Sequence, residues 1–141
     1  MFNARGGLAH LKEFLQKELP ILSPELVVVT GDLTDAKSKW KLSSSQFEQE
    51  WAAYHAALKE SGVLERASFW FDQRGNHDCF DVAGFDHESN HYKVYSSVKE
   101  EGYAFHLKKS FGTYSFIGID AWYHLVKAHV QIVRAMEHGD P

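Results

Sequence analysis

The hydrophobic pattern of the chain predicts two short buried strands with a helix between them. Residues 26–30 are the β-branched run Leu-Val-Val-Val-Thr, and residues 68–71 are the aromatic run Ser-Phe-Trp-Phe. Both runs are typical of buried strands. The segment between them predicts a helix that starts at a capping box of Ser45 and Glu48 and ends at Gly62. Its apolar stripe consists of Phe47, Trp51, Tyr54 and Leu58. A strand, a helix and a second strand in this order predict a parallel pair with a right-handed crossover.

The segments on either side predict further helices and a hairpin. A leucine stripe near the N-terminus predicts a helix that ends at Pro20, because proline interrupts helical hydrogen bonding. Residues 103–108 and 113–120 predict a β-hairpin that extends the sheet. Apolar residues again follow helical spacing from 122 to 138. The leucine stripe consists of Leu8, Leu11, Leu15 and Leu19.

Polar loops follow both predicted parallel strands. Residues 31–35 are Gly-Asp-Leu-Thr-Asp, and residues 74–78 are Arg-Gly-Asn-His-Asp. The carboxyl ends of parallel strands meet at one edge of a sheet, which is where ligands bind in open α/β sheets. Carboxylate and amide oxygens suit hard divalent cations, and an imidazole can accept or donate a proton near pH 7. The loop at 74–78 alone is equally consistent with a polar turn, and Asp32 alone is more consistent with a turn or helix-cap residue. Two such loops at one edge favour a metal-assisted phosphoesterase site.

Composition narrows the class of protein. The 141 residues are 44% hydrophobic and 14% aromatic, which is enough for one domain with a sizeable core. The formal net charge of −4 shows no excess of basic residues of the kind that binds nucleic acid or anionic lipid. The single cysteine rules out an internal disulfide and leaves the compartment open. No apolar run reaches 18 residues, so the sequence predicts no membrane span in this chain.

The two loops in this order resemble signature blocks of the calcineurin-like metallophosphoesterases. The first block is Gly-Asp-x-x-Asp at residues 31–35, and the second is Gly-Asn-His-Asp at residues 75–78. Longer stretches resemble the transmembrane protein 62-like branch of that family, notably residues 30–37 and 116–121. The resemblance covers residues 8–121. It implies a metallophosphoesterase-type α/β/β/α sandwich, and it implies that the parent protein is membrane-anchored outside this chain.

The resemblance also implies roles for individual residues. Asp32 would bridge two divalent metal ions of the Mn, Fe, Zn or Mg class, and Asn76 would bind the second of them. His77 would protonate the leaving oxygen or bind the phosphate. Asp35 would hold the His77 imidazole by a hydrogen bond, as carboxylates around catalytic groups do. Arg74 would contact a phosphate oxygen.

Other blocks of the family pattern do not occur in the chain. The family opens with Asp-x-His and closes with Gly-His and Gly-His-x-His, and this sequence contains none of them. We therefore expect the sandwich to be incomplete at both ends. Residues 1–121 would form a partial phosphoesterase domain, followed by a divergent helical tail at residues 122–141.

Two functional interpretations follow from this pattern. One is a metal-dependent phosphoesterase domain that hydrolyses a phosphate ester and is weakly active or inactive as it stands. The alternative is a non-catalytic remnant or interaction domain that keeps the fold. The missing ligand blocks favour the alternative for this chain, and the two intact blocks favour the enzyme for its parent.

Overall fold

The computed structural model describes residues 6–38, 40, 42–66 and 68–120. The N-terminal helical segment comprises α1 (Gly7–Glu13), the π-helical turn η1 (Phe14–Glu18) and α2 (Leu19–Leu22). The remaining elements are β1 (Val27–Val29), α3 (Glu48–Glu60), η2 (Val63–Glu65), β2 (Trp70–Asp72), η3 (His77–Cys79), α4 (Tyr92–Tyr95), β3 (Gly102–Lys109) and β4 (Gly112–Ile119). The helix predicted from residue 122 onward lies outside the described residues.

The two predicted strands pair as expected. β1 and β2 run parallel, with Val27 opposite Trp70 and Val29 opposite Asp72. The ladder continues beyond the last pair through a 3.0 Å hydrogen bond from Gln73 N to Val29 O. Both polar loops therefore leave the sheet at the same edge, as the strand, helix, strand order predicts.

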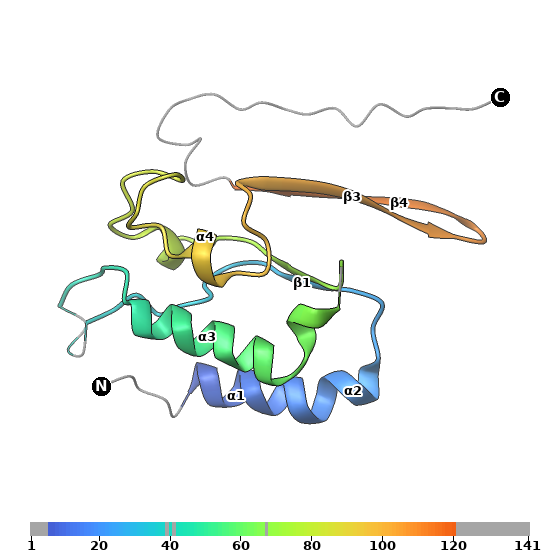
Figure 1. The fold of residues 1–141 in the computed structure, drawn as a ribbon, viewed down its shortest axis with the longest axis horizontal. Helices are drawn as coiled ribbons and strands as arrows, with labels where there is room; N and C mark the ends of the chain where they lie inside the picture. The colour runs from blue at the N-terminus through green and yellow to red at the C-terminus, as the bar shows by residue number, and fades with distance from the viewer. Residues whose placement is uncertain (1–5, 39, 41, 67, 121–141) are drawn as a thin grey trace.

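The elements form layers on either side of this parallel pair. Helices α1 and α3 lie on one side of it, and the β3–β4 hairpin lies on the other (Figure 1). Alternate side chains of a strand point to opposite faces. Val27 and Val29 accordingly pack against the helical core, whereas Phe71 stacks on Phe105 of the hairpin with ring centroids 4.0 Å apart. The buried members of the helical core are Leu15, Leu19, Tyr54, Ala57, Leu58, Val63, Phe69 and Trp70. The protein therefore has the predicted α/β fold.

The N-terminal helix does not end at Pro20, so that prediction is wrong. Helical structure continues to Leu22 and ends at Ser23, whose φ is +42°. The π-helical turn η1 directly precedes α2 and changes the hydrogen-bonding register. Pro20 then lies in the first turn of α2, where its missing N–H costs little.

Two other local predictions are also wrong. The hairpin does not extend the parallel sheet: within the described part of the chain, β3 and β4 form a separate antiparallel sheet. It joins the parallel pair through stacked rings rather than through backbone hydrogen bonds. The capping box at α3 is absent, because the N-cap is Phe47 and the Ser45 hydroxyl donates to Asp81 Oδ2 at 3.1 Å.

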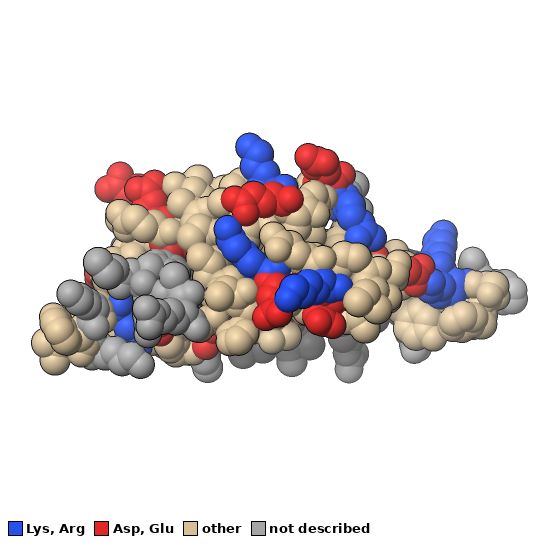
Figure 2. Space-filling view, turned by 90° about the horizontal axis from the view of Figure 1, so that it is seen from below, with Lys and Arg blue, Asp and Glu red and all other residues tan. Residues whose placement is uncertain are grey.

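Charged side chains of both signs are scattered over the helical face. Figure 2 shows this face with acidic and basic groups interspersed rather than separated. One ion pair of 3.0 Å joins Lys12 of α1 to Glu60 of α3. Because both partners are exposed, this pair adds little to stability.

Candidate functional site

The two polar loops meet at a pair of glycines. A Cβ atom on Gly31 would lie under 3.0 Å from the Gly75 main chain, and one on Gly75 would lie under 3.0 Å from Asp32. Real Cβ atoms essentially never come so close, so glycine at both positions permits the contact. Gly31 also has a φ of +105°, which other residues rarely adopt. We call the contact between residues 31–35 and 74–78 the loop junction.

Asp78 holds the two loops of the junction together by hydrogen bonds. Its fully buried carboxylate accepts hydrogen bonds from Leu33 N at 3.0 Å, Thr34 N at 3.0 Å, Thr34 Oγ1 at 3.2 Å and Gly75 N at 2.9 Å. Burial raises the pKa of Asp78, and the bonds from Gly75, Leu33 and Thr34 oppose that shift. One side chain thus ties the first loop to the second.

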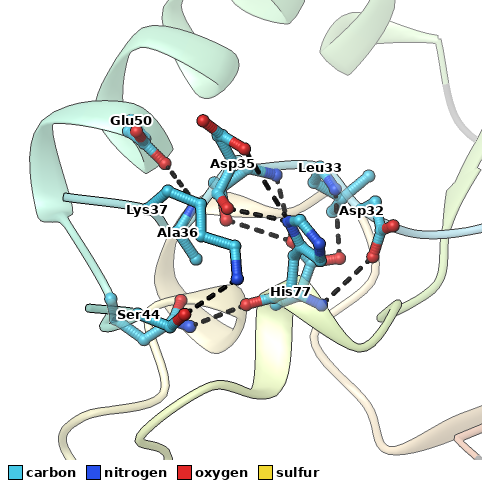
Figure 3. A network of polar contacts seen from close by, with 11 residues as sticks. Asp32, Leu33, Asp35, Ala36, Lys37, Ser44, Glu50 and His77 are labelled. Carbon is cyan, nitrogen blue, oxygen red and sulfur yellow. Dashed lines mark hydrogen bonds and ion pairs between the residues drawn. The ribbon is translucent and has the colours of Figure 1, made fainter. Parts of the chain in front are cut away.

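Within the loop junction, His77 of the second loop contacts Asp32 and Asp35 of the first (Figure 3). His77 N donates to Asp32 Oδ1 at 3.1 Å, and His77 Nδ1 lies 2.7 Å from the main-chain oxygen of Asp35. A carbonyl oxygen can only accept, so Nδ1 carries a proton and Nε2 is left for other partners. The Asp35 carboxylate is 3.9 Å from Nδ1 and its side chain is 62% exposed. The close Asp35–His77 contact is therefore made by the main chain, whereas the family resemblance implied the carboxylate.

A cavity of about 980 Å³ opens beside these residues. Its lining includes Asp32, Asp35, Lys37, Glu50, Tyr54 and His77. Glu50 reaches this wall from α3, and its Oε2 accepts the Ala36 N–H at 2.9 Å. Burial raises the pKa of Glu50, and the bond from Ala36 opposes that shift. Lys37 is engaged locally, because its Nζ donates to Ser44 Oγ at 2.9 Å and lies 4.5 Å from the Phe80 ring centroid.

Arg74 and Asn76 are placed differently from the other candidates. The Arg74 side chain is 1% exposed and forms an ion pair with Asp120 at the end of β4. Its guanidinium also lies 4.8 Å from the Phe85 ring centroid. Asn76 is exposed at the start of η3. Neither residue belongs to the described lining of the cavity, so the structure groups Asp32, Asp35 and His77 but not the full set of five.

The described residues do not complete a metal site. Within residues 6–38, 40, 42–66 and 68–120, no three His, Cys, Asp or Glu side chains are grouped so that they could hold an ion. Asp32 and Asn76 offer two oxygen donors, whereas divalent cations of this class take four or more ligands. The two residues alone therefore do not fit a resident dinuclear centre.

Sequence reasoning did not predict the roles of two acidic residues, Glu50 in the cavity wall and Asp78 between the two loops. Glu50 lies three residues after Phe47 and four before Tyr54, so it falls on the apolar stripe of α3. An acid on that stripe signals a buried carboxylate with a specific partner. No comparable sequence signal marked Asp78. Three of its four hydrogen-bond donors belong to Leu33 and Thr34, which lie 44 or more residues away in the sequence, and the fourth is the Gly75 amide.

Comparison with models of known protein families identifies the family of this chain. The calcineurin-like phosphoesterase model matches residues 4–139. The chain belongs to the calcineurin-like phosphoesterase family. The resemblance carried by the two loops is thereby confirmed, and membership accounts for a glycine-bearing loop with acidic residues after each parallel strand.

Two curated relatives share most of this chain. Transmembrane protein 62 of Mus musculus is 40% identical over 121 residues, which are 85% of this chain and 19% of that protein. An Arabidopsis thaliana protein, assigned by its name to the metallophosphoesterases, is 32% identical over 123 residues, or 81% of this chain and 16% of that protein. The chain thus spans less than a fifth of the length of these relatives.

No solved structure matches the chain. Among the described residues, no helix combines the length and the apolar character needed to cross a membrane.

Proposed function

We propose that the chain supplies part of the active site of a metal-dependent phosphoesterase, which hydrolyses phosphate esters. The observation that carries this proposal is the loop junction, which holds Asp32, Asp35 and His77 together at the edge of a parallel sheet. Family membership supports the reaction class. The substrate is a phosphate ester whose alcohol portion would lie in the cavity beside these residues.

His77 is the proposed acid for the leaving oxygen. Its Nδ1 proton is held by the Asp35 main-chain oxygen, so Nε2 is the nitrogen that can exchange a proton with a substrate. His77 lines the cavity together with Asp32. The imidazolium form, which carries a second proton on Nε2, can protonate a departing alkoxide or donate to a phosphate oxygen, and proton transfer then leaves the Nδ1–H tautomer.

Asp32 and Asn76 are the proposed metal ligands of this chain. Asp32 follows β1 with a φ of +55°, and its Oδ1 is anchored by the His77 N–H, which leaves Oδ2 available. Further donors are needed beyond the described residues. We therefore expect weak metal affinity and weak or absent turnover by the chain itself.

A non-catalytic domain is the second candidate function. The observation in its favour is the lack of any cluster of three ligating side chains among the described residues. The two candidates differ in one property that can be measured directly. A partial metal site attracts a cation selectively to the loop junction, whereas a remnant does not.

The first experiment is a titration of the isotope-labelled chain with Mn²⁺, followed by paramagnetic broadening of backbone amide signals. We expect the signals of Asp32, Asn76 and His77 to broaden first, and this selectivity to disappear in Asp32→Asn. The matched control is Asp86→Asn, because the Asp86 side chain is 90% exposed and lies outside the site. Uniform or absent broadening at the loop junction would favour the remnant.

The second experiment measures Mn²⁺-dependent hydrolysis of a chromogenic phosphomonoester and a phosphodiester. We expect the chain to stay close to the background given by Asp32→Asn and His77→Asn. The histidine control is His87→Asn, since His87 is exposed and bonds Ser89. Clear turnover that both site variants abolish would contradict the expected weak activity and would show that the chain assembles a working site.

A further inference from the structure

The peptide group between Asp35 and Ala36 is held on both of its sides. Its N–H, that of Ala36, donates to Glu50 Oε2 at 2.9 Å. Its carbonyl, that of Asp35, accepts from His77 Nδ1 at 2.7 Å. Figure 3 shows the Glu50 carboxylate, this peptide and the His77 ring in succession. A single rigid amide thus connects an acid on α3 with the imidazole of the candidate site.

Burial strengthens the hydrogen bond between the Ala36 N–H and the Glu50 carboxylate. Glu50 is 8% exposed and Ala36 is fully buried. A hydrogen bond to an ionised acceptor is roughly twice as strong as a neutral one, and low local dielectric strengthens it further. A carboxylate that accepts the N–H also polarises the amide, so the carbonyl at its other end becomes a better acceptor.

The backbone at Ala36 needs such a restraint. Ala36 has a φ of +49°, in the left-handed region that a non-glycine residue adopts at a cost of about 1–2 kcal/mol. Rotation of the preceding peptide would relax that strain and would turn the Asp35 carbonyl away from His77. The hydrogen bond from Ala36 N to Glu50 opposes this rotation.

The Asp35 carboxylate is poorly placed to hold the His77 ring. Its Oδ1 is 3.9 Å from His77 Nδ1, beyond hydrogen-bonding distance, and the side chain is largely in solvent. Water therefore screens its charge. Of the carboxylates that line the cavity, Glu50 is the one coupled to the ring through short contacts.

We propose that Glu50 is a positioning residue that fixes the Nδ1–H tautomer of His77 through the Asp35–Ala36 peptide. Glu50 accepts a hydrogen bond from the peptide N–H, the peptide carbonyl accepts one from Nδ1–H of His77, and Nε2 remains free to exchange a proton. The catalytic consequence rests on the proposed function, because a fixed tautomer matters for turnover only if His77 serves as the acid. The structural statement itself does not depend on activity.

The test is the tautomer of the His77 ring, measured by ¹⁵N NMR of the ring nitrogens in the full chain at about pH 8.5, where an ordinary imidazole is neutral. We expect Nδ1–H to dominate in the unmodified protein. In Glu50→Ala the ratio of Nδ1–H to Nε2–H should fall by about tenfold, because the peptide loses its charged acceptor. In Glu50→Gln, which keeps the side-chain volume and a neutral acceptor, it should fall by about threefold.

The matched control is Glu48→Gln, which makes the same chemical change on an exposed position of the same helix. We expect it to leave the tautomer ratio unchanged. A wild-type ring that is mainly Nε2–H would overturn the proposal. So would an unchanged ratio in Glu50→Gln, a variant that remains decisive if Glu50→Ala does not fold.

The outcomes also separate this proposal from the proposed function. An altered tautomer in the Glu50 variants, together with no selective Mn²⁺ broadening in the unmodified chain, would support the positioning role and reject the partial metal site. The reverse combination would reject Glu50 as the positioning residue while leaving Asp32 and His77 in their proposed roles.

Discussion

The loop junction and the β3–β4 hairpin both adjoin the parallel pair, but different kinds of contact hold them in place. The junction relies on directional polar contacts, since Asp78 alone accepts four hydrogen bonds and two glycines bring the backbones together. The hairpin relies mainly on stacked rings, since the Phe105 ring centroid lies 4.0 Å from that of Phe71 and 4.9 Å from that of Phe116. Its one buried polar link among the described ion pairs is that of Asp120, after β4, with Arg74. Beyond these rings, Phe111 at the end of the hairpin is 76% exposed.

This difference separates a region that must keep its geometry from one that can shift. A hydrogen bond weakens steeply when its angle or length changes, so a network of them defines atomic positions. Apolar contact is non-directional and varies with buried area, so a stacked layer tolerates small displacements. We therefore expect substitutions at the loop junction to disturb the candidate site, and substitutions of the stacked rings to loosen mainly the hairpin, because they leave the Arg74–Asp120 ion pair in place.

Removal of the Asp78 carboxylate should have the largest effect. Asp78→Ala leaves the Leu33, Thr34 and Gly75 amides without their acceptor, and each buried unpaired group costs about 1–3 kcal/mol. We expect the free energy of unfolding, measured by urea denaturation, to fall by about 4 kcal/mol. The exposed control Asp86→Ala should change it by less than about 0.5 kcal/mol. Equal effects of the two variants would show that Asp78 does not hold the loops.

A methyl group at the glycine contact should have the next largest effect. In Gly75→Ala the new Cβ would overlap Asp32, so the loops must separate, at a cost of about 2 kcal/mol. The control Gly7→Ala has no neighbouring atom within 4 Å and lies in α1, where alanine is favoured. Thermal unfolding should show a lower midpoint for Gly75→Ala and an equal or higher one for Gly7→Ala. A Gly75→Ala midpoint equal to the wild type would disprove the close contact.

Loss of the central ring of the hairpin should have a smaller and more local effect. Phe105→Ala removes both stacking contacts of a half-buried ring and should cost about 1.5 kcal/mol. Hydrogen exchange should accelerate in β3 and β4, while the Leu33, Thr34 and Gly75 amides keep their wild-type rates. The exposed control Phe111→Ala should leave both sets unchanged. Faster exchange at the loop junction in Phe105→Ala would mean that the two regions are coupled.

The effect that is smallest near neutral pH concerns Cys79, which is buried next to Asp78. Burial raises the pKa of the Cys79 thiol from 9.0 to about 12. The folded protein resists deprotonation that the unfolded chain undergoes, so this contribution to stability is complete below pH 9.0 and is lost as pH rises toward about 12. Between these values, the wild type should lose more stability than Cys79→Ala in urea denaturation. The thiol of the folded protein should also react slowly with iodoacetamide, whereas rapid alkylation would contradict its burial.

The sequence predicted the parts of the fold that depend on local pattern. The β-branched run at β1 and the aromatic run at β2 specify strands, and their parallel order places both loops at one edge. β2 is buried as predicted, whereas β1 is only partly buried and Val28 is 40% exposed. The hairpin between Gly102 and Ile119 also followed from its alternation and turn. These features succeed because side-chain periodicity and glycine geometry are properties of neighbouring residues.

The remaining features depend on contacts between distant residues. Ser45 bonds Asp81 instead of capping α3, and Arg74 pairs with Asp120 rather than facing the cavity. The Asp35 carbonyl, not its carboxylate, makes the close contact with His77 because the chain turns at Ala36. Such choices are made by tertiary geometry, so no local sequence signal specifies them. The assignment of Asp32 and Asn76 to a metal remains a prediction.

The most direct test of a preformed loop junction is native-state hydrogen exchange of the Leu33, Thr34 and Gly75 amides. All three donate to Asp78, and the Gln73 amide of the parallel ladder provides the internal reference. We predict that the three amides exchange about as slowly as Gln73, because they open only when the sheet and its loops unfold together. Exchange of these amides at the rate of unprotected loop amides, with Gln73 still protected, would show that the junction is not preformed and would contradict this account.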